Sequence, residues 1–389
     1  MFKKRLILSD IEKYINSPEA LIISGMRRTG KTTLLKHLFN KIKSKNKLFL
    51  DLENPINRKY FEEENYEQIK KAFEFLGIVF YEKLYVFLDE IQFVKNLPSV
   101  VKYFIDNYGV KFFLTGSASF YLKNLFVESL AGRKIIFEIN PLTFSEFLEF
   151  KNVNFKVTQD IDDVTKEIHE TIKPLYEEYL FYGGFPQVVL KNNVEAKKKA
   201  IEDVFTSFYQ LEVLQLGDFR KNEVLRDLML LLMQRAGTKL DVLRLSKELR
   251  ISRQTLNNYI SFLRETYFLH TVTPFSRGAD SEIRKTPKVY FCDCGILNSF
   301  THINKGVLFE NAVFQNLRVK GKINYFQKKS GVEIDFIFEN KCAFEIKTTS
   351  HESDIKKLKN LSSQLKLKNF KIVSLEYSYL KNVIYPYML

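Results

Sequence analysis

The sequence predicts a multidomain α/β protein: a parallel-sheet domain, a helical segment, a helix-turn-helix and a smaller α/β domain near the C-terminus. Five short apolar runs between residues 20 and 139 alternate with helical patterns, as strands do in a parallel sheet covered on both faces. A helix-turn-helix pattern follows at 240–267, and from about 306 the order is helix, strand, strand, strand, helix, strand. We therefore expect domains at 1–150, 151–222, 223–290 and 291–389.

Length and composition narrow the class of protein. The chain has 389 residues, of which 45% are hydrophobic, so it can bury several cores. No apolar run is long enough to cross a bilayer, the start lacks the pattern of a secretion signal, and three cysteines make no disulfide framework, so we expect a cytoplasmic protein with no membrane partner. The net charge of +14 fits a partner rich in phosphate, although scattered lysines in a basic proteome would give the same value.

The first strand leads into a phosphate-binding loop. The segment SGMRRTGKTT contains Gly25-x4-Gly30-Lys31-Thr32 between an apolar strand and a helical run, which is the P-loop pattern. Its glycines let backbone N–H groups point at phosphate oxygens, and the helix N-terminus adds a favourable dipole. Lys31 would bridge the β- and γ-phosphates of ATP, and the Thr32 hydroxyl would ligate Mg²⁺. The other nucleotide contacts predicted in this segment are Arg28, Thr29 and Thr33.

Two later strands complete the predicted site. LYVFLDEIQFV ends in Asp89, which would hold Mg²⁺, and Glu90, which would orient or deprotonate the attacking water; the alternative is two solvated turn carboxylates. In KFFLTGSAS, Thr115 and Ser117 would hydrogen-bond the water or the γ-phosphate. Arg133, in LAGRK, is a candidate charge-neutralising arginine, in cis or from a neighbouring subunit, or else an exposed structural residue.

These motifs, with PLTFSEFL and YGGFP, resemble those of an archaeal and bacterial family of AAA+ P-loop ATPases, over about residues 5 to 375. The resemblance implies a helical lid, a winged helix and a C-terminal restriction-endonuclease-like domain. It also implies that Gly183, Gly184 and Pro186 sense the bound nucleotide. Taken by themselves, these residues indicate only a kink between two helices.

The helix-turn-helix pattern has an apolar side and a polar side. Leu256, Ile260 and Leu263 would form the buried stripe of the second helix, with Ser252 as its N-cap. The inward residues before it are expected to be Leu243, Leu245, Leu249 and Ile251. The polar residues Arg253, Gln254, Asn257 and Asn258 would face a DNA major groove, as in the winged helix that this segment resembles. Packing within the protein alone is the equal alternative.

The segment GVEIDFIFENKCAFEIK predicts two strands around a turn. Alternation places apolar residues on one face and charged ones on the other, as in any half-exposed hairpin. A three-residue turn at 339–341 sets Asp335 opposite Glu345, and Glu333 opposite Lys347. Facing carboxylates destabilise a hairpin, so their position makes sense if a divalent cation lies between them.

A glutamate on the preceding helix adds a third carboxylate. Glu310 shares a stripe with apolar residues, and a glutamate in that position is seldom buried without a partner. Glu310, Asp335, Glu345 and Lys347 together resemble the PD-(D/E)xK nuclease pattern. In that interpretation the carboxylates hold Mg²⁺ or Mn²⁺, and Lys347 orients the water or stabilises developing charge. The lysine-rich helix at 353–366 would lie along a phosphate backbone.

The sequence therefore predicts an ATP-dependent nucleic-acid enzyme, with DNA favoured over RNA. The alternative is a nucleotide-switched protein that binds DNA or another protein through an inactive nuclease fold. The oligomeric state stays open, because the arginine finger is not identified.

Overall fold

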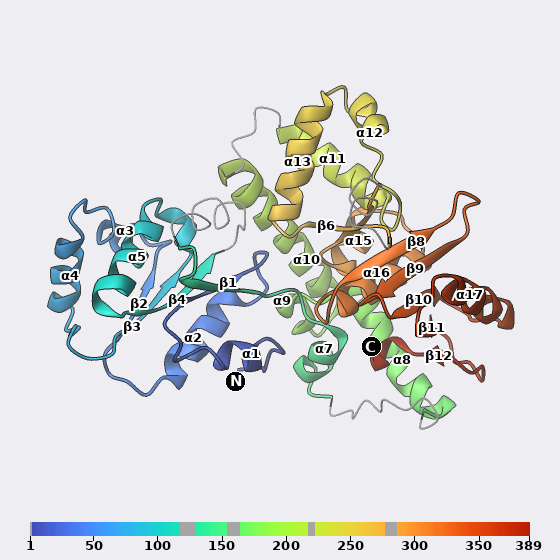
Figure 1. The fold of residues 1–389 in the computed structure, drawn as a ribbon, viewed down its shortest axis with the longest axis horizontal. Coiled ribbons are helices and arrows are strands. Elements are labelled where there is room, and N and C mark those ends of the chain that lie inside the picture. Colours follow the sequence, from blue (N-terminus) through green and yellow to red (C-terminus); the bar gives the residue numbers. More distant parts are fainter. Residues whose placement is uncertain (1, 117–129, 154–163, 217–221, 277–285) are drawn as a thin grey trace. The chain divides into compact units, whose positions relative to one another are not determined.

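The computed structural model describes residues 2–116, 130–153, 164–216, 222–276 and 286–389 (Figure 1). These residues divide into two compact units. The first unit contains residues 1–140 with 265–267, and the second contains 141–264 with 268–389. Ser117 of the predicted site lies outside the described residues. Within the described ranges, no helix combines the length and the apolar character needed to span a membrane.

The first unit is built on a parallel sheet of five strands in the order β2-β3-β4-β1-β5. All five predicted strands are confirmed: β1 (Ala20–Ser24), β2 (Lys47–Asp51), β3 (Tyr85–Asp89), β4 (Lys111–Gly116) and β5 (Lys134–Glu138). The central strands are buried on both faces, as continuous apolar runs predict. The edge strands β2 and β5 are only partly buried.

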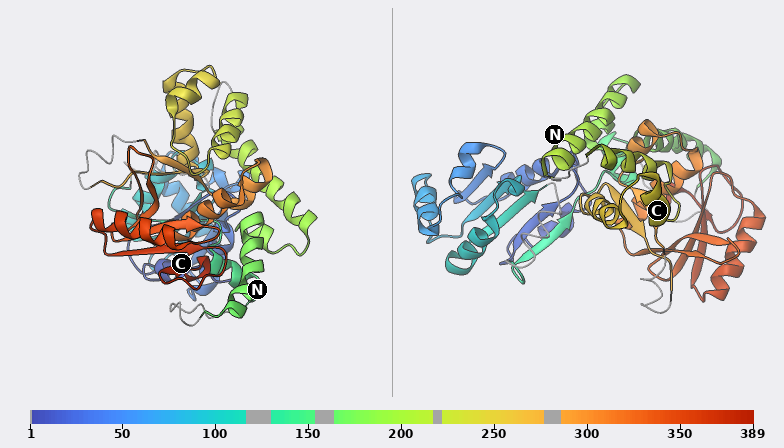
Figure 2. Two further views of the ribbon diagram at one scale, coloured as in Figure 1. Left: turned by 90° about the vertical axis from the view of Figure 1, so that its right-hand side faces the viewer. Right: turned by 90° about the horizontal axis from the view of Figure 1, so that it is seen from above.

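Helices cover both faces of this sheet (Figures 1 and 2). One core joins Ile22 and Leu114 of the sheet to Phe104 of a helix, and a second core joins Ile23 and Phe113 to Leu34. The helices are α1 (Leu8–Glu12), α2 (Lys31–Lys41), α3 (Pro55–Lys59), α4 (Tyr66–Phe75) and α5 (Leu97–Tyr108). The two cores fix the carboxyl ends of β1, β3 and β4, which carry the predicted nucleotide residues, at one edge of the sheet.

The second unit begins with helices, as expected. They are α7 (Phe144–Phe150), α8 (Lys166–Tyr182), α9 (Pro186–Val189), α10 (Val194–Phe208), a π-helix (Tyr209–Leu216) and α11 (Asn222–Gln234). The helix-turn-helix segment forms α12 (Val242–Glu248) and α13 (Arg253–Glu265), followed by the antiparallel pair β6 (Leu269–Val272) and β7 (Lys288–Phe291), and then α15 (Cys294–Phe300).

The interior of the helix-turn-helix agrees with the sequence pattern in part, since the predicted inward residues Leu249 and Ile251 are only partly buried and one position is wrong. Leu256, Ile260 and Leu263 are buried along α13, and Leu245 is buried in α12. The inward placement of Leu243 was wrong, because its side chain is 51% exposed. It lies in the first turn of a seven-residue helix, too short for periodicity to fix which residues face inward.

The last part of the second unit has the predicted order, followed by one further short strand, β12, that was not predicted. Its elements are α16 (Lys305–Arg318), β8 (Ile323–Gln327), β9 (Glu333–Phe338), β10 (Cys342–Lys347), α17 (Glu352–Gln364), β11 (Asn369–Ser374) and β12 (Val383–Ile384). The sheet order is β12-β11-β10-β9-β8. The predicted register of the β9–β10 hairpin is confirmed, because Cys342 pairs with Phe338 and Phe344 with Phe336. A three-residue turn with two left-handed residues, Glu339 and Asn340, connects the strands.

Candidate functional site

The P-loop joins β1 to α2 along a backbone path that requires glycine at two positions. Gly30 has φ 99° and immediately precedes α2, which begins at Lys31. A Cβ at Gly25 would lie 2.1 Å from the carbonyl oxygen of Ile139, so a side chain there would push the loop from the sheet. Lys31 is buried, and its Nζ donates to the carbonyl oxygens of Gly25 (2.9 Å) and Met26 (3.0 Å). The loop therefore fixes the lysine ammonium against its own carbonyl groups, where the sequence predicts the phosphates of ATP.

Arg5, which lies before β1 in the sequence, holds the loop by hydrogen bonds to backbone carbonyl groups. Its guanidinium is buried and donates to the carbonyl oxygens of Thr29 (2.7 Å) and Asn140 (2.6 Å). The Thr29 hydroxyl in turn donates to the carbonyl oxygen of Met26 (2.8 Å). Arg5 was not predicted from the sequence, because FKKR gives no local sign of which cation turns inward.

The second half of the site forms where β3 and β4 end. Asp89 is 3% exposed, accepts a hydrogen bond from the Thr115 hydroxyl and is also hydrogen-bonded to Thr32. Burial raises the pKa of Asp89 above its usual range. The alternative of a solvated turn carboxylate is therefore wrong for Asp89. Three residues from separate parts of the sequence converge, all of types that bind Mg²⁺ or water.

Glu90 follows in the left-handed region, with φ 55°. Its carboxylate accepts from the Gln92 side chain and lies 4.0 Å from the guanidinium of Arg27. Because the backbone turns sharply between Asp89 and Glu90, the two carboxylates need not share one direction. That separation allows one to hold a metal and the other to act on water.

Other predicted nucleotide residues are less enclosed. Arg28 (φ 67°) and Thr33 are exposed. Arg133 pairs with Asp106 of α5 at 2.6 Å, and both side chains are partly exposed. This pair accounts for the position of Arg133 within its own chain. A role as arginine finger stays a prediction.

The Gly-Gly-Phe-Pro segment lies in the second unit, where it packs against Asp293. The Gly184 N–H donates to Asp293 Oδ2 (2.7 Å), and Asp293 Oδ1 accepts from the Ile296 N–H (3.1 Å). A Cβ at Gly183 would lie 2.0 Å from Asp293 Oδ1, and one at Gly184 would lie 2.3 Å from the Leu142 carbonyl oxygen. Close packing thus explains why glycines occupy these two positions. Nucleotide sensing by Gly184 and Pro186 stays a prediction.

The buried carboxyl of Asp293 is expected to make stability depend on pH. Burial raises its pKa from 3.8 to about 6, against hydrogen bonds that lower it. The folded state keeps the proton to higher pH, so the free energy of unfolding should fall by about 3 kcal/mol as pH rises from about 4 to 6. Denaturant unfolding at several pH values would measure this slope. Asp293→Asn should flatten it, and an unchanged slope in that variant would assign the dependence to another group.

The polar residues of α13 lie as expected. Arg253, Gln254, Asn257 and Asn258 are exposed on the side opposite the buried stripe. The Ser252 hydroxyl accepts from the Thr255 N–H (3.0 Å), which caps the helix. The exposed side is therefore available to a ligand.

The carboxylates of the C-terminal hairpin are buried. Asp335 is 7% and Glu345 is 3% exposed, so the interpretation of this face as a solvated one was wrong for both residues. Asp335 Oδ2 accepts from the Ile346 N–H (2.8 Å). Glu345 Oε1 pairs with Lys347 (3.0 Å) and Lys357 (3.5 Å), while its buried Oε2 has no hydrogen-bond partner in the described part of the chain.

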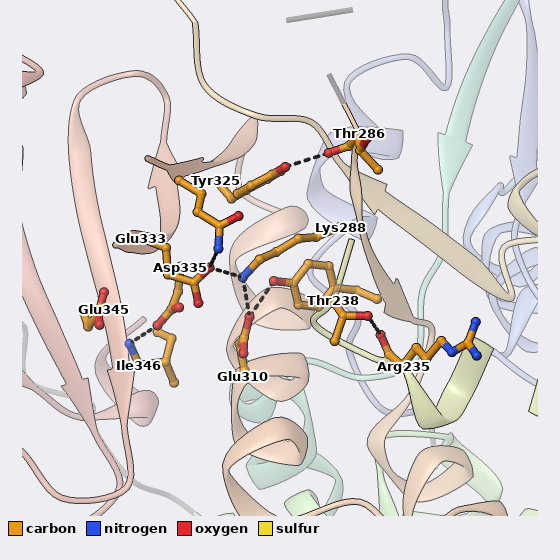
Figure 3. Close-up of polar contacts among 12 residues, drawn as sticks. Arg235, Thr238, Thr286, Lys288, Glu310, Tyr325, Glu333, Asp335, Glu345 and Ile346 are labelled. Carbon is orange, nitrogen blue, oxygen red and sulfur yellow. Dashed lines mark hydrogen bonds and ion pairs between the residues drawn. The ribbon is translucent and has the colours of Figure 1, made fainter. Parts of the chain in front are cut away.

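Glu310 approaches this hairpin from α16 (Figure 3). Its Oε1 accepts from the Tyr290 hydroxyl at 2.6 Å. Burial raises the pKa of Glu310, and burial followed by the charges of Glu310 and Glu345 raises the pKa of Asp335 well above its usual range. The three predicted carboxylates therefore lie near enough to repel one another.

A lysine that the sequence analysis missed lies among these acids. Lys288 of β7 is buried, and its Nζ lies 3.3 Å from Glu333 Oε2 and 3.8 Å from Glu310 Oε1. Although burial lowers its pKa, Glu310, Asp335 and Glu333 raise it overall, so Lys288 stays charged. One sign of this position was present in the sequence, where the lysine lies within the apolar run PKVYF. A lysine in such a run is rarely buried unless it is paired with an acid.

The carboxylates of this cluster suit a hard divalent cation in their chemistry. They are not arranged as three ligands around a common point. The described ranges contain no group of three or more His, Cys, Asp or Glu side chains placed to hold a metal ion. The available groups are all carboxylates, and the unpartnered Glu345 Oε2 is a buried oxygen of the kind that Mg²⁺ or Mn²⁺ prefers. The residues therefore fit such a cation in chemistry.

Comparison with known proteins gives matches to three successive parts of the chain. An AAA domain matches residues 17–148, and two domains of unknown function match residues 173–306 (DUF8612) and 305–383 (DUF4143). An uncharacterized protein of Methanocaldococcus jannaschii is 30% identical over 97% of this chain and 86% of its own length. One from Haemophilus influenzae is 26% identical, over 91% and 90%.

Among solved structures, a Walker-type ATPase of Pyrococcus abyssi is similar with a TM-score of 0.42 and 16% identity, covering 77% of this chain and 96% of its own. The AAA match covers the parallel sheet with its P-loop. This part of the chain therefore has an AAA-type ATPase fold.

Proposed function

Because the chain belongs to the family of the Methanocaldococcus jannaschii protein and carries an AAA domain, we propose that it is a Mg²⁺-dependent ATPase that controls a nucleic-acid-binding C-terminal part. The observation that carries the ATPase is the convergence of Thr32, Asp89 and Thr115 beside the P-loop lysine. Such an arrangement supplies partners for the phosphates of ATP and ligands for the metal ion bound to them.

Each residue has a role in this proposal. Lys31 moves from the loop carbonyls to the β- and γ-phosphates, and the N–H groups of the loop bind phosphate oxygens. Thr32 and Asp89 hold Mg²⁺, which neutralises charge on the phosphates when it is bound. Glu90 orients the attacking water, and Thr115 keeps the Asp89 carboxylate in place.

Lys31→Ala is expected to weaken ATP binding about tenfold to a hundredfold, because a charge-assisted hydrogen bond to phosphate is worth about 1.5–3 kcal/mol. Isothermal titration calorimetry with ATP and Mg²⁺ would measure the change. The matched control is Lys36→Ala, an exposed lysine on the same helix, which should bind ATP like the wild type. Equal affinity in both variants would place the nucleotide elsewhere.

For the second unit we propose a metal-dependent site that acts on a phosphodiester, with DNA as the favoured substrate. Support comes from the buried carboxylates of Asp335 and Glu345, from the partly buried Glu310, and from Lys347 beside Glu345. Lys347 would orient the water or stabilise charge on the scissile phosphate. A divalent cation would supply an acidified water and neutralise that phosphate. The winged-helix interpretation of α12, α13, β6 and β7 gives this unit a DNA-contacting surface.

A second candidate function is a nucleotide-switched binding protein with an inactive nuclease fold. It is favoured by Lys288, whose ammonium already neutralises part of the carboxylate cluster without a metal. The two functions differ in a direct assay. An enzyme cuts DNA or RNA when Mn²⁺ is present, whereas a binding module cuts neither and shows an affinity for its partner that differs between ATP and ADP.

A further inference from the structure

We propose that Lys288 and a divalent metal ion compete for the same carboxylates, so that Lys288 sets the metal affinity of the C-terminal site. This inference rests on the metal-dependent site proposed above and identifies its regulating residue. It concerns a lysine outside the predicted ligand set, on a strand that precedes the hairpin in the sequence.

The Lys288 side chain is enclosed by residues of several elements. Its side chain is 5% exposed and lies between Glu310 of α16 and Glu333 of β9 (Figure 3). The ring of Tyr325 lies 5.5 Å from its Nζ, as an aromatic wall for the ammonium. Burying a lysine costs free energy unless it is compensated, and here the acids of two elements compensate it.

The cations of the cluster divide between two sets of acids. Lys347 and Lys357 pair with Glu345. Lys288 pairs with Glu310 and Glu333, and Asp335 lies within the charge range of both Lys288 and Lys347. Among the described residues, Lys288 is therefore the lysine that forms ion pairs with Glu310 of α16 and Glu333 of β9.

A metal ion bound by Glu310 and Asp335 would lie within a few ångströms of this ammonium. Like charges at such a distance repel strongly where water is largely excluded. The metal can bind only as the ammonium withdraws from the carboxylates. The same pairing explains why no group of three ligands is assembled in the described chain. The carboxylates partly face a lysine instead of a shared point.

The competition has a chemical consequence. With Lys288 in place, the partly buried acids around it are partly neutralised, so the domain would need no metal to fold. When a metal binds, its affinity is reduced by the free energy of displacing the lysine. Lys288 would thereby keep the site empty until the metal concentration, or a phosphate that brings its own metal, shifts the balance.

The test is a Mn²⁺ titration by calorimetry of the full chain without nucleotide, wild type against Lys288→Met. Methionine keeps the length and apolar stem of lysine and removes the charge. We expect the dissociation constant for Mn²⁺ to fall about tenfold or more. The melting temperature without metal should drop, and Mn²⁺ should raise it more than in the wild type. The matched control, Lys341→Met, removes an exposed lysine in the turn of the hairpin and should change neither value.

The outcomes separate the two proposals. If the wild type and Lys288→Met both fail to bind Mn²⁺, the metal site itself is wrong. If the wild type binds and Lys288→Met binds equally or more weakly, the competition is wrong and the metal site stands. Should Lys288→Met not fold, amine labelling of the wild type gives the answer. Labelling of Lys288 should rise with Mn²⁺ while Lys341 stays constant, and an unchanged Lys288 would overturn the inference.

Discussion

Glu90→Gln is expected to lower the rate of ATP hydrolysis by about a hundredfold or more while ATP binding persists. A positioned general base contributes roughly 10²–10⁴-fold to a rate, and glutamine keeps the shape of the side chain but cannot accept a proton from water. Glu90 is suited to the role because its left-handed backbone allows its side chain to take a different direction from that of Asp89. Asp89, buried one residue earlier, keeps the metal.

Steady-state phosphate release and calorimetric ATP affinity would together test this. Glu53→Gln, an exposed acid after the neighbouring strand β2, serves as the control and should hydrolyse ATP like the wild type. A Glu90→Gln protein that retains full turnover would move the catalytic base to another residue. A variant that loses binding as well would instead assign Glu90 to the structure of the loop, through its contacts with Gln92 and Arg27.

The positions of the candidate nucleotide residues were largely predictable, because these residues lie at the ends of strands with strong local patterns. A continuous apolar run followed by Asp89, or by Thr115, fixes both the strand and the sheet edge at which it ends. Arg5 could not be predicted in this way. Its two carbonyl partners lie 24 and 135 residues away, and no local pattern encodes which of several cations reaches them.

The C-terminal cluster shows where such reasoning ends. The turn length gave the register of β9 and β10 correctly, since paired positions must keep both faces consistent. Burial of Asp335 and Glu345 was a separate question, because alternation describes a half-exposed strand and a covered one equally well. Lys288 arrives from β7, a strand of another sheet, so its pairing with Glu310 depends on tertiary packing.

Asp335→Asn is expected to abolish metal binding at the C-terminal site while the fold is retained. Burial and the charges of Glu310 and Glu345 raise the pKa of Asp335 well above its usual range, so its carboxylate lies in an environment that resists negative charge. Asparagine has the shape of aspartate without its charge, and it can still accept from the Ile346 N–H, as Asp335 does at 2.8 Å. Its weaker carboxamide ligand should reduce Mn²⁺ affinity by more than the roughly 10–100-fold that loss of an outer-shell partner causes.

Calorimetric Mn²⁺ titration, thermal unfolding and cleavage of DNA substrates would be compared between the wild type and Asp335→Asn. The control is Glu352→Gln, which neutralises a largely exposed carboxylate at the start of α17 and should alter none of the three. Lost metal binding with an unchanged melting temperature supports a cation held by these acids. If Asp335→Asn binds Mn²⁺ like the wild type, then the buried carboxylates serve only their lysine partners. The C-terminal part would then act by binding, and its affinity for DNA or a protein should change between ATP and ADP.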